Sequence, residues 1–279
     1  MFLFIATCAT PLVDNKKVPK IIMGNCISQV SASETKEGQC AIKLRLYSDF
    51  TCPYCYLEFT RLRLAMANLP EDQRLPLSHG PFQIDETLPA EGVDKYNFLS
   101  RLIPPEALDP MIDDLCRQFR ELDREMNPRG MLGNSAPAHR LQIWAEENLP
   151  EPQATELKDC LFQIHCYEGK SMSDIDAIVK AAARAGLTDE VQVRKVIDDK
   201  SYFTKLTKAK KHAKDKLGID AVPALMVIQD CGKKKILEEA SNIESVTGMQ
   251  ELVQKQCLLM TDDDIRMGKV TRRPSACCD

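Results

Sequence analysis

The amino-acid sequence predicts an α/β fold, in which two sheet-forming regions flank a long helical stretch. Residues 41–48 alternate apolar and polar side chains with the two-residue period of a strand. Residues 224–228 form a continuous apolar run, which is typical of a central strand buried on both faces. From about residue 92 to residue 197, the apolar residues recur at helical spacings.

The first sheet-forming region has the order strand, helix, strand. The helix is expected to begin directly after Thr51, because five apolar residues then recur at spacings of four and three on one helical face. They are Cys55, Phe59, Leu62, Met66 and Leu69. Thr51 or Cys52 can serve as the N-cap, and Pro53 suits the first turn, where its missing N–H costs nothing. A second strand is expected at residues 75–82.

The middle of the chain contains several separate predicted helices. A long apolar stripe covers residues 108–126, and further helices are expected at 136–147, 153–167 and 174–185. Another helix runs through residues 202–217. Its lysines surround an intact apolar stripe, so we interpret them as a solvated outer face rather than a nucleic-acid-binding surface.

The second sheet-forming region begins with the strand at 224–228. A turn at 230–233, an antiparallel strand at 235–238 and a closing helix at 249–259 are expected to follow. The two ends of the chain lack periodicity. Residues 1–39 are therefore predicted to be a flexible leader and residues 261–279 a disordered tail.

Composition indicates a globular protein rather than a nucleic-acid-binding or membrane-spanning one. The chain has 279 residues, a net charge of −4 and no segment long and apolar enough to cross a bilayer. Its 12 cysteines are scattered, which differs from the dense framework of small disulfide-rich secreted domains. We interpret most of them as reduced thiols, which favours a cytoplasmic location.

The N-terminus contains two competing signals. Residues 1–13 form a short apolar run, but no basic residue precedes it, so a secretory signal is the weaker interpretation. Met23-Gly24-Asn25-Cys26-Ile27-Ser28 matches the N-myristoylation pattern, with Cys26 placed for a palmitoyl group. This modification requires translation to start at Met23, and the preferred interpretation is a chance match. A lipid anchor through Gly24 and Cys26 remains the alternative.

The pair Cys52 and Cys55 carries the chemistry that the sequence predicts. Cys52 stands at the start of a helix, where the macrodipole and unpaired backbone N–H groups favour the reactive thiolate. Cys55 lies nearly one turn deeper, on the buried stripe. Cys52 is therefore expected to attack a substrate disulfide and Cys55 to resolve the mixed disulfide.

Two other interpretations of this pair compete with the redox one. A zinc site needs four ligands, and the nearest candidates, His165 and Cys166, are isolated in the sequence, so no metal is expected. A chance pair is the second alternative in a chain with many cysteines. The position between a strand and an amphipathic helix favours the redox interpretation.

The segment Ser48-Asp49-Phe50-Thr51-Cys52-Pro53-Tyr54-Cys55-Tyr56 resembles the active-site segment of the DsbA-like family, specifically its FrnE-type branch. Further segments resemble motifs of that branch and follow in the same order. They are Pro81-Phe82-Gln83-Ile84, Leu88-Pro89-Ala90-Glu91-Gly92, Asn134 to Leu141, Leu161-Phe162-Gln163, Glu168-Gly169-Lys170, Val222-Pro223 and Gly248-Met249-Gln250. The resemblance covers about residues 42–258.

This resemblance implies a thioredoxin-like fold with an all-helical insertion domain. The thioredoxin-like parts would be residues 40–91 and 198–260, and the insert would be residues 92–197. It also implies dithiol exchange with proteins or small thiols, and a cis peptide bond between Val222 and Pro223 beside Cys52. The Val222 backbone would then bind an extended substrate peptide by strand addition. Glutathione is the only co-substrate that we consider, and the oligomeric state is left open.

The dipeptide Pro53-Tyr54 departs from the family pattern. DsbA-type proteins carry Pro-His and the FrnE branch usually carries Pro-Trp, whereas Pro-Tyr is the glutaredoxin dipeptide. The related kappa-class glutathione transferases and 2-hydroxychromene-2-carboxylate isomerases carry serine at the position of Cys52. A glutathione-dependent transferase or isomerase, acting on a small hydrophobic substrate, is thus the alternative function. A binding protein that uses the fold as a peptide clamp is a third.

Two polar residues are candidates for supporting roles. Asp49 precedes the dithiol, where it can relay a proton near Cys55 or cap the turn, and the sequence does not separate these roles. His139, next to Arg140 on a predicted helix of the insert, can face the cleft. The preferred interpretation is a solvated surface pair, because no partner for it is identifiable in the sequence.

Overall fold

The computed structural model describes residues 42–229, 233–237, 240, 243 and 245–266, with side chains up to Gln256 in the last range. All of these belong to one compact unit, Glu37–Asp279. The predicted leader, its Gly24 and Cys26 sites, most of the turn at 230–233 and the tail from residue 267 onward lie outside the described residues.

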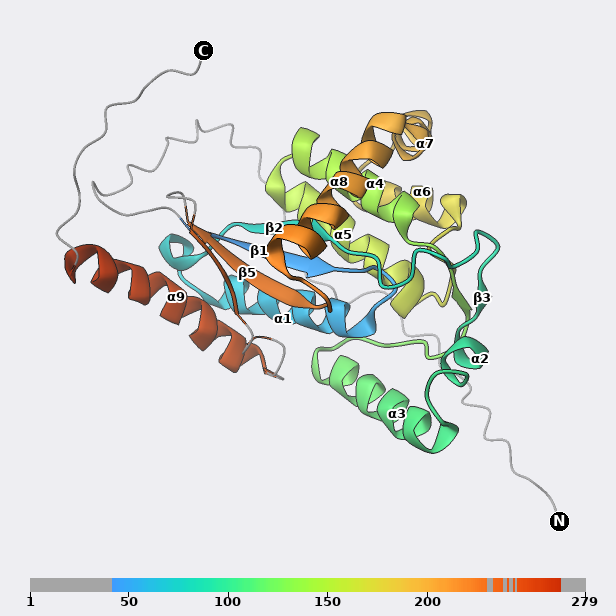
Figure 1. Cartoon of the computed structure of the whole chain (residues 1–279), viewed down its shortest axis with the longest axis horizontal. Helices are drawn as coiled ribbons and strands as arrows, with labels where there is room; N and C mark the ends of the chain where they lie inside the picture. Colours follow the sequence, from blue (N-terminus) through green and yellow to red (C-terminus); the bar gives the residue numbers. More distant parts are fainter. Residues whose placement is uncertain (1–41, 230–232, 238–239, 241–242, 244, 267–279) are drawn as a thin grey trace, which may run out of the picture. The chain divides into compact units, whose positions relative to one another are not determined.

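A four-stranded mixed sheet forms the centre of the fold (Figure 1). Its strands have the order β2-β1-β5-β6 and are β1 (Ile42–Ser48), β2 (Leu77–Pro81), β5 (Ala224–Gln229) and β6 (Lys234–Ile236). β1 pairs in parallel with β2 and antiparallel with β5, and β6 pairs antiparallel with β5. The predicted strands are therefore confirmed.

Helices cover both faces of this sheet. α1 (Pro53–Asn68) and α9 (Val246–Arg266) pack together on one face, and α8 (Lys200–Leu217) lies on the other (Figure 1). In β5, Leu225 and Val227 join the core that includes α1, whereas Met226 packs with Ala213 of α8. This alternation explains the continuous apolar run, because both faces of the strand are buried.

The segment between β2 and α8 is mainly helical, so the predicted α/β fold with a helical insertion is confirmed. Its helices are α2 (Lys95–Leu99), α3 (Pro105–Glu121), α4 (Ala136–Asn148), α5 (Glu151–Cys166), α6 (Ile175–Arg184) and α7 (Glu190–Asp198). The insert is not entirely helical, because β3 (Val93–Asp94) and β4 (Met131–Leu132) form a short antiparallel ladder. Strands of two residues carry no periodic signal in a sequence.

The closing helix is longer than expected. α9 begins at Val246 and continues to Arg266, which includes the first residues of the segment expected to be disordered. The helix can continue this far because no glycine or proline interrupts the sequence between Met249 and Gly268. The polar composition of residues 261–266 does not by itself end a helix.

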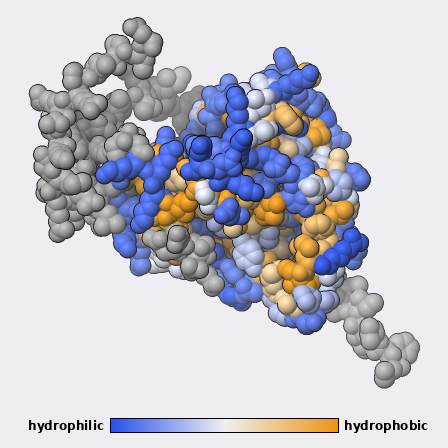
Figure 2. All heavy atoms as spheres, in the orientation of Figure 1, coloured by the Kyte–Doolittle hydropathy of each residue, from blue (hydrophilic) through white to orange (hydrophobic). Residues whose placement is uncertain are grey.

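Hydrophobic residues gather at the surface around α2 and the segment that leads to α3 (Figure 2). Leu102, in this segment, is 68% exposed. Leu102 also lines a cavity that Cys52 borders.

Gly80 of β2 permits a close cross-strand contact with its neighbour Tyr47 of β1. A Cβ atom added at Gly80 would collide with the Tyr47 ring, since it would lie only 2.6 Å from its Cε1 atom. Gly80→Ala is therefore expected to lower the free energy of unfolding by about 1–3 kcal/mol, the usual cost of overpacking. Urea unfolding measures this change. In a Tyr47→Ala background the cost should largely disappear, and an unchanged cost would contradict the steric explanation.

Candidate active site

The strand β1 leads through a short turn directly into α1, and this connection positions the two cysteines. Cys52 is the N-cap of α1, with extended backbone angles, and Pro53 occupies the first helical position as expected. The Sγ atom of Cys52 accepts a hydrogen bond from the backbone N–H of Cys55, at 3.4 Å. The helix N-terminus thus provides a donor to the sulfur atom that the sequence predicts to be reactive.

The two cysteines differ in depth and are both free thiols. The side chain of Cys52 forms part of a cavity wall, whereas Cys55 is 0% exposed within the core. Burial raises the pKa of the Cys55 thiol well above its usual value of 9.0, and the hydrogen bond with Cys52 acts in the same direction. Cys55 is therefore held as a thiol at neutral pH.

Asp49 is buried immediately before the dithiol turn. Its Oδ1 atom accepts a hydrogen bond from the backbone N–H of Thr51 at 3.2 Å, and its Oδ2 atom accepts one from Ile84 at 2.7 Å. Burial alone would raise the pKa of this carboxyl, but His139 and the Ile84 N–H outweigh it and lower the pKa. The capping role expected for Asp49 is thus present, and the carboxylate is ionised at neutral pH.

His139 is not part of a surface pair, which corrects the preferred interpretation from the sequence. It is 0% exposed, and its Nε2 atom lies 3.5 Å from Oδ1 of Asp49, at the outer limit of a hydrogen bond. The reason is that α4 packs against β2, which turns His139 toward the sheet. His139 Nδ1 lies 3.0 Å from Nε2 of His79 in β2, and the two rings stack at 15°.

His79 and Lys158 extend this buried polar cluster, and sequence reasoning missed both. His79 Nδ1 lies 3.3 Å from Oγ of Ser48, and burial, followed by the charge of Lys158, lowers its pKa well below 6.5. Lys158 of α5 is 3% exposed, and its Nζ atom lies 5.0 Å from the centroid of the Phe59 ring. Burial lowers the pKa of Lys158 to about 8, although the charges of Glu146 and Cys55 oppose this shift.

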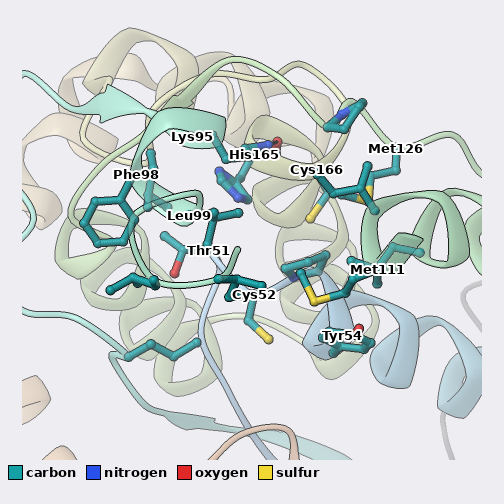
Figure 3. Close-up of a pocket in the computed structure, with 18 of the residues that line it drawn as sticks. Thr51, Cys52, Tyr54, Lys95, Phe98, Leu99, Met111, Met126, His165 and Cys166 are labelled. Carbon is teal, nitrogen blue, oxygen red and sulfur yellow. Dashed lines mark hydrogen bonds between the residues drawn. The ribbon is translucent and has the colours of Figure 1, made fainter. Parts of the chain in front are cut away.

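A cavity of about 310 Å³ opens beside Cys52 (Figure 3). It lies between the N-terminus of α1, the α2–α3 segment and the C-terminal end of α5. Cys52 and Tyr54 form part of its wall, together with Lys95, His165 and Cys166. His165 and Cys166 are also the nearest candidates for zinc ligands in the sequence. Within the described part of the chain, no group of three or more His, Cys, Asp or Glu side chains is arranged to hold a metal ion.

The peptide bond between Val222 and Pro223 is cis, as the resemblance implied. This bond directly precedes β5. Ala224, the first residue of β5, pairs with Tyr47 near the end of β1, so the cis bond lies at the end of the sheet from which β1 leads toward the dithiol. Val222 also lines a second hollow, of about 500 Å³, together with Lys210 and Lys214 of α8. Among the described helices, none is long and apolar enough to cross a membrane.

Comparisons with known proteins agree with this architecture. A curated relative, the uncharacterized protein YwbO of Bacillus subtilis (strain 168), is 23% identical over 208 residues, which is 73% of this chain and 97% of the relative. A probable DsbA oxidoreductase from Streptomyces coelicolor superposes with a TM-score of 0.63 at 20% identity, covering 85% of this chain and 94% of that one. The cytosolic disulfide reductase DsbM from Pseudomonas aeruginosa gives a TM-score of 0.57 at 14% identity, over 78% and 99% of the two chains.

These structural likenesses concern the fold, since their sequence identities are low. The family itself follows from a match that covers most of the chain. The family profile described as DSBA-like thioredoxin domain matches residues 43–251, a span that runs from β1 into α9 and includes both cysteines. The chain therefore belongs to the DSBA-like thioredoxin domain family.

Proposed function

We propose that this protein is a thiol–disulfide oxidoreductase, in which Cys52 attacks the substrate and Cys55 resolves the intermediate. The observation that carries the proposal is the difference in depth between the two thiols at the start of α1. Cys52 borders a cavity and receives a backbone N–H, whereas Cys55 is enclosed and kept protonated by burial. Cys52 is itself only 6% exposed, but a substrate in the cavity can reach it, whereas Cys55 at 0% exposure is reached only through Cys52. An accessible attacking thiol and an enclosed resolving thiol are what a two-step exchange requires.

The reaction runs in two displacements. The Cys52 thiolate attacks one sulfur of the substrate disulfide, so that a Cys52–substrate disulfide forms and the other substrate sulfur leaves as a thiolate. Cys55 then loses its proton and attacks Cys52, which releases the second substrate thiol and leaves a Cys52–Cys55 disulfide. The reverse sequence oxidises a dithiol substrate. The proposal covers both directions.

The buried cluster supports the second displacement. Cys55 reacts only as a thiolate, and burial, followed by the hydrogen bond with Cys52, raises its pKa in the resting protein, whereas a hydrogen bond with the Asp49 backbone lowers it. We extend the proposal to Asp49 and His139 as positioning residues, which fix the turn before Cys52. Lys158 is the nearby cation that interacts with the charge of Cys55 and thereby favours the thiolate formed during resolution.

The Cys55→Ser variant tests the assignment of roles. It is expected to accumulate a stable mixed disulfide between Cys52 and a disulfide-bonded substrate such as insulin, because the resolving thiol is missing. In the wild-type dithiol at about pH 8, substoichiometric iodoacetamide should label Cys52, since burial keeps the Cys55 pKa well above 9.0. Peptide mass spectrometry locates both adducts. Preferential labelling of Cys55, or trapping by Cys52→Ser instead, would reverse the assignment.

Glutathione is the proposed small-molecule co-substrate, and the second hollow supports it. Lys214 places an ammonium group in the wall of this hollow, where a carboxylate-bearing thiol has a cationic partner. Lys210 lines the same hollow, but its ammonium group is already paired with Glu86 at 2.9 Å. The apolar cavity at Cys52 favours the alternative, a glutathione-dependent transferase or isomerase that acts on a small hydrophobic molecule. Mixed disulfides with glutathione at Cys52 support exchange. Net transfer of glutathione to an apolar acceptor would support the alternative.

The proposal places the protein in the cytoplasm, or at the cytosolic face of a membrane if translation starts at Met23. In the second case, myristoylation of Gly24 alone would give only marginal binding, with an association constant of about 10⁴ M⁻¹, and palmitoylation of Cys26 would decide stable attachment. Mass spectrometry of the native N-terminal peptide distinguishes the two cases. An unmodified peptide that begins at Met1 or Phe2 would exclude the anchor.

A further inference from the structure

The helix α8 carries a concentration of positive charge that contrasts with the rest of the chain. It contains seven lysines and one acidic residue, whereas the whole chain has a net charge of −4. Hydrophilic side chains gather at the surface over this helix (Figure 2). The rest of the chain is therefore more acidic than the net charge suggests, and α8 is a local source of positive potential.

The lysines of α8 differ in whether they are available to a partner. Lys205 and Lys210 form ion pairs with carboxylates of neighbouring segments. Lys208, Lys211 and Lys214 are exposed, and within the described part of the chain none of their ammonium groups has an ion pair or a hydrogen bond. Because residues three apart are neighbours on a helix, these three lie in a row, which we call the lysine stripe.

The lysine stripe leads to the exchange site. Lys214, at its C-terminal end, lines the hollow of about 500 Å³ beside Val222. Ile84 lines both this hollow and the cavity at Cys52, so the two depressions meet at its side chain. The backbone of Ile84 is fixed there, because its N–H donates to Oδ2 of Asp49 at 2.7 Å. A surface path thus connects Cys52 with the stripe.

Acidic residues near the stripe do not neutralise it. Asp215 is the one acidic residue of α8, and Asp220 lies in the wall of the hollow. Both are exposed, and among the described residues neither carboxylate has an ion-pair partner. Glu86, the other acidic residue of that wall, is already paired with Lys210 at 2.9 Å. Positive charge therefore exceeds negative charge from the hollow outward along α8.

We propose that the lysine stripe binds acidic segments of polypeptide substrates, close to the substrate cysteine that reacts with Cys52. Lys208 and Lys214 are six positions apart, which is about 9 Å along a helix and the length of about three extended residues. A few Asp or Glu residues near the substrate cysteine would therefore meet the stripe. The inference rests on the proposed exchange at Cys52 and adds a class of substrate to it.

The bonds that change are those of the exchange itself. The Cys52 thiolate attacks one sulfur of the substrate disulfide, a Cys52–substrate disulfide forms, and the other substrate sulfur leaves as a thiolate that takes up a proton from water. The stripe makes no covalent bond. It increases the rate of encounter and holds the acidic segment, so its effect belongs to the second-order rate constant of the first step.

The net charge and the lysine stripe predict opposite preferences. A chain with a net charge of −4 attracts basic peptides at long range, whereas the stripe attracts acidic peptides beside the exchange site. The sign of the preference therefore distinguishes a local recognition surface from the overall charge of the protein.

The test measures the first step on the full-length Cys55→Ser variant, which stops at the mixed disulfide. Three peptides differ only in the three residues on each side of a central cysteine, which are all glutamate, all glutamine or all lysine. Each peptide is supplied as its symmetric disulfide, and mass spectrometry measures the rate of adduct formation at Cys52. Each rate is divided by the rate of the same disulfide with 2-mercaptoethanol, a neutral thiol, which removes differences in intrinsic reactivity.

At about 0.01 M salt, we expect the acidic peptide to react at least about tenfold faster than the basic peptide, the lower end of electrostatic steering. At about 1 M salt the Debye length falls from about 30 Å to about 3 Å, so the ratio of the two rates should approach one. A faster reaction of the basic peptide at low salt, or equal rates, would overturn the inference.

Reversing the charge of the stripe should reverse the preference. In Lys208→Glu/Lys211→Glu/Lys214→Glu, combined with Cys55→Ser, the ratio of acidic to basic rates at low salt should fall below about one. All three positions are exposed, so the fold should persist, and circular dichroism checks it. If the variant does not fold, the sign and the salt dependence of the preference in Cys55→Ser still decide the question.

The matched control is Lys233→Glu/Lys234→Glu/Lys235→Glu, which makes the same change in net charge on exposed residues. Lys234 pairs with Ile228, which in turn pairs with Lys43 near the start of β1, so these lysines lie at the end of the sheet away from the dithiol. The acidic peptide should remain the faster one in this control.

Equal losses of preference in the two triple variants would overturn the inference, while exchange at Cys52 stands if the neutral peptide still reacts. Absence of any adduct at Cys52, with the neutral peptide included, would overturn the proposed function as well.

Discussion

Replacing Cys52 by serine is expected to reduce the rate of insulin disulfide reduction by at least about a thousandfold, because the loss of the attacking nucleophile removes the covalent pathway. A serine hydroxyl at the same N-cap position can still accept the N–H of Cys55, so the helix start should persist. The reduction of insulin by dithiothreitol, followed by turbidity, measures the catalysed rate. Circular dichroism and urea unfolding establish that the variant is folded.

Cys116→Ser is the matched control for this substitution. Cys116 lies on α3 and does not line the cavity at Cys52, and burial raises the pKa of its thiol. The control variant should retain activity within about twofold of the wild type, because substitutions away from special features have small effects. A loss of activity in Cys116→Ser that equals the loss in Cys52→Ser would contradict the assignment of the nucleophile.

The second large effect concerns the buried pair of Asp49 and His139. His139→Leu removes the side-chain partner of a carboxylate that is 1% exposed, and it leaves Nε2 of His79 without its present neighbour. We expect the free energy of unfolding to fall by at least about 3 kcal/mol, because a buried charged acceptor left without its partner costs more than the roughly 1–3 kcal/mol of a neutral group. Urea or guanidinium unfolding at about pH 7 measures it. His212→Leu, on an exposed position of α8, should change stability by less than about 0.5 kcal/mol.

The effect of this pair should depend on pH in a defined direction. The folded-state pKa of Asp49 is lower than its usual value of 3.8, so the folded protein binds fewer protons than the unfolded chain as the pH approaches that value. Its contribution is therefore present above about pH 4 and lost as the pH falls through the folded-state pKa. The difference in unfolding free energy between wild type and His139→Leu should shrink below about pH 4. A difference that stays constant between about pH 3 and pH 7 would contradict the electrostatic explanation.

The same substitution separates structural from functional effects. If His139 positions the turn before Cys52, His139→Leu should lower the rate of mixed-disulfide resolution more than the rate of the first attack. His139→Gln, which restores a polar neighbour for Asp49, should recover part of the resolution rate. Stopped-flow measurement of the two steps distinguishes these outcomes. Equal losses in both steps, without rescue by glutamine, would reduce the role of His139 to stability alone.

The features that the sequence predicted correctly depend on short-range patterns. The alternation in residues 42–48 marks β1, and the apolar spacing that begins at Cys55 marks α1. The helix is not buried on one face only, because all residues from 55 to 62 are buried. Pro53 at the first helical position and Cys52 at the N-cap follow from helix-end preferences that act within one turn. For this reason the position of the dithiol relative to its strand and helix was predictable.

The features that the sequence missed depend on long-range packing. His139 and His79 are 60 positions apart and meet only because α4 packs against β2. The burial of Lys158 likewise requires α5 to lie in the core. The available signal in the sequence was that its neighbours one helical turn away, Ala154 and Phe162, are apolar. The cavity at Cys52 combines α1, α2, α3 and the end of α5, so no single segment indicated it. His165 and Cys166 both lie in the wall of this cavity.

The central claim is that Cys52 and Cys55 form one exchange couple, and a redox titration tests it most directly. The protein is equilibrated in a series of glutathione buffers, the thiols are trapped with acid and alkylated, and each cysteine is mapped by peptide mass spectrometry. The account predicts one reversible transition in which Cys52 and Cys55 change together from two alkylated thiols to a single disulfide, with a midpoint between about −270 and −120 mV. Two cysteines that remain alkylated in every buffer, or a disulfide that joins either of them to another cysteine, would contradict it.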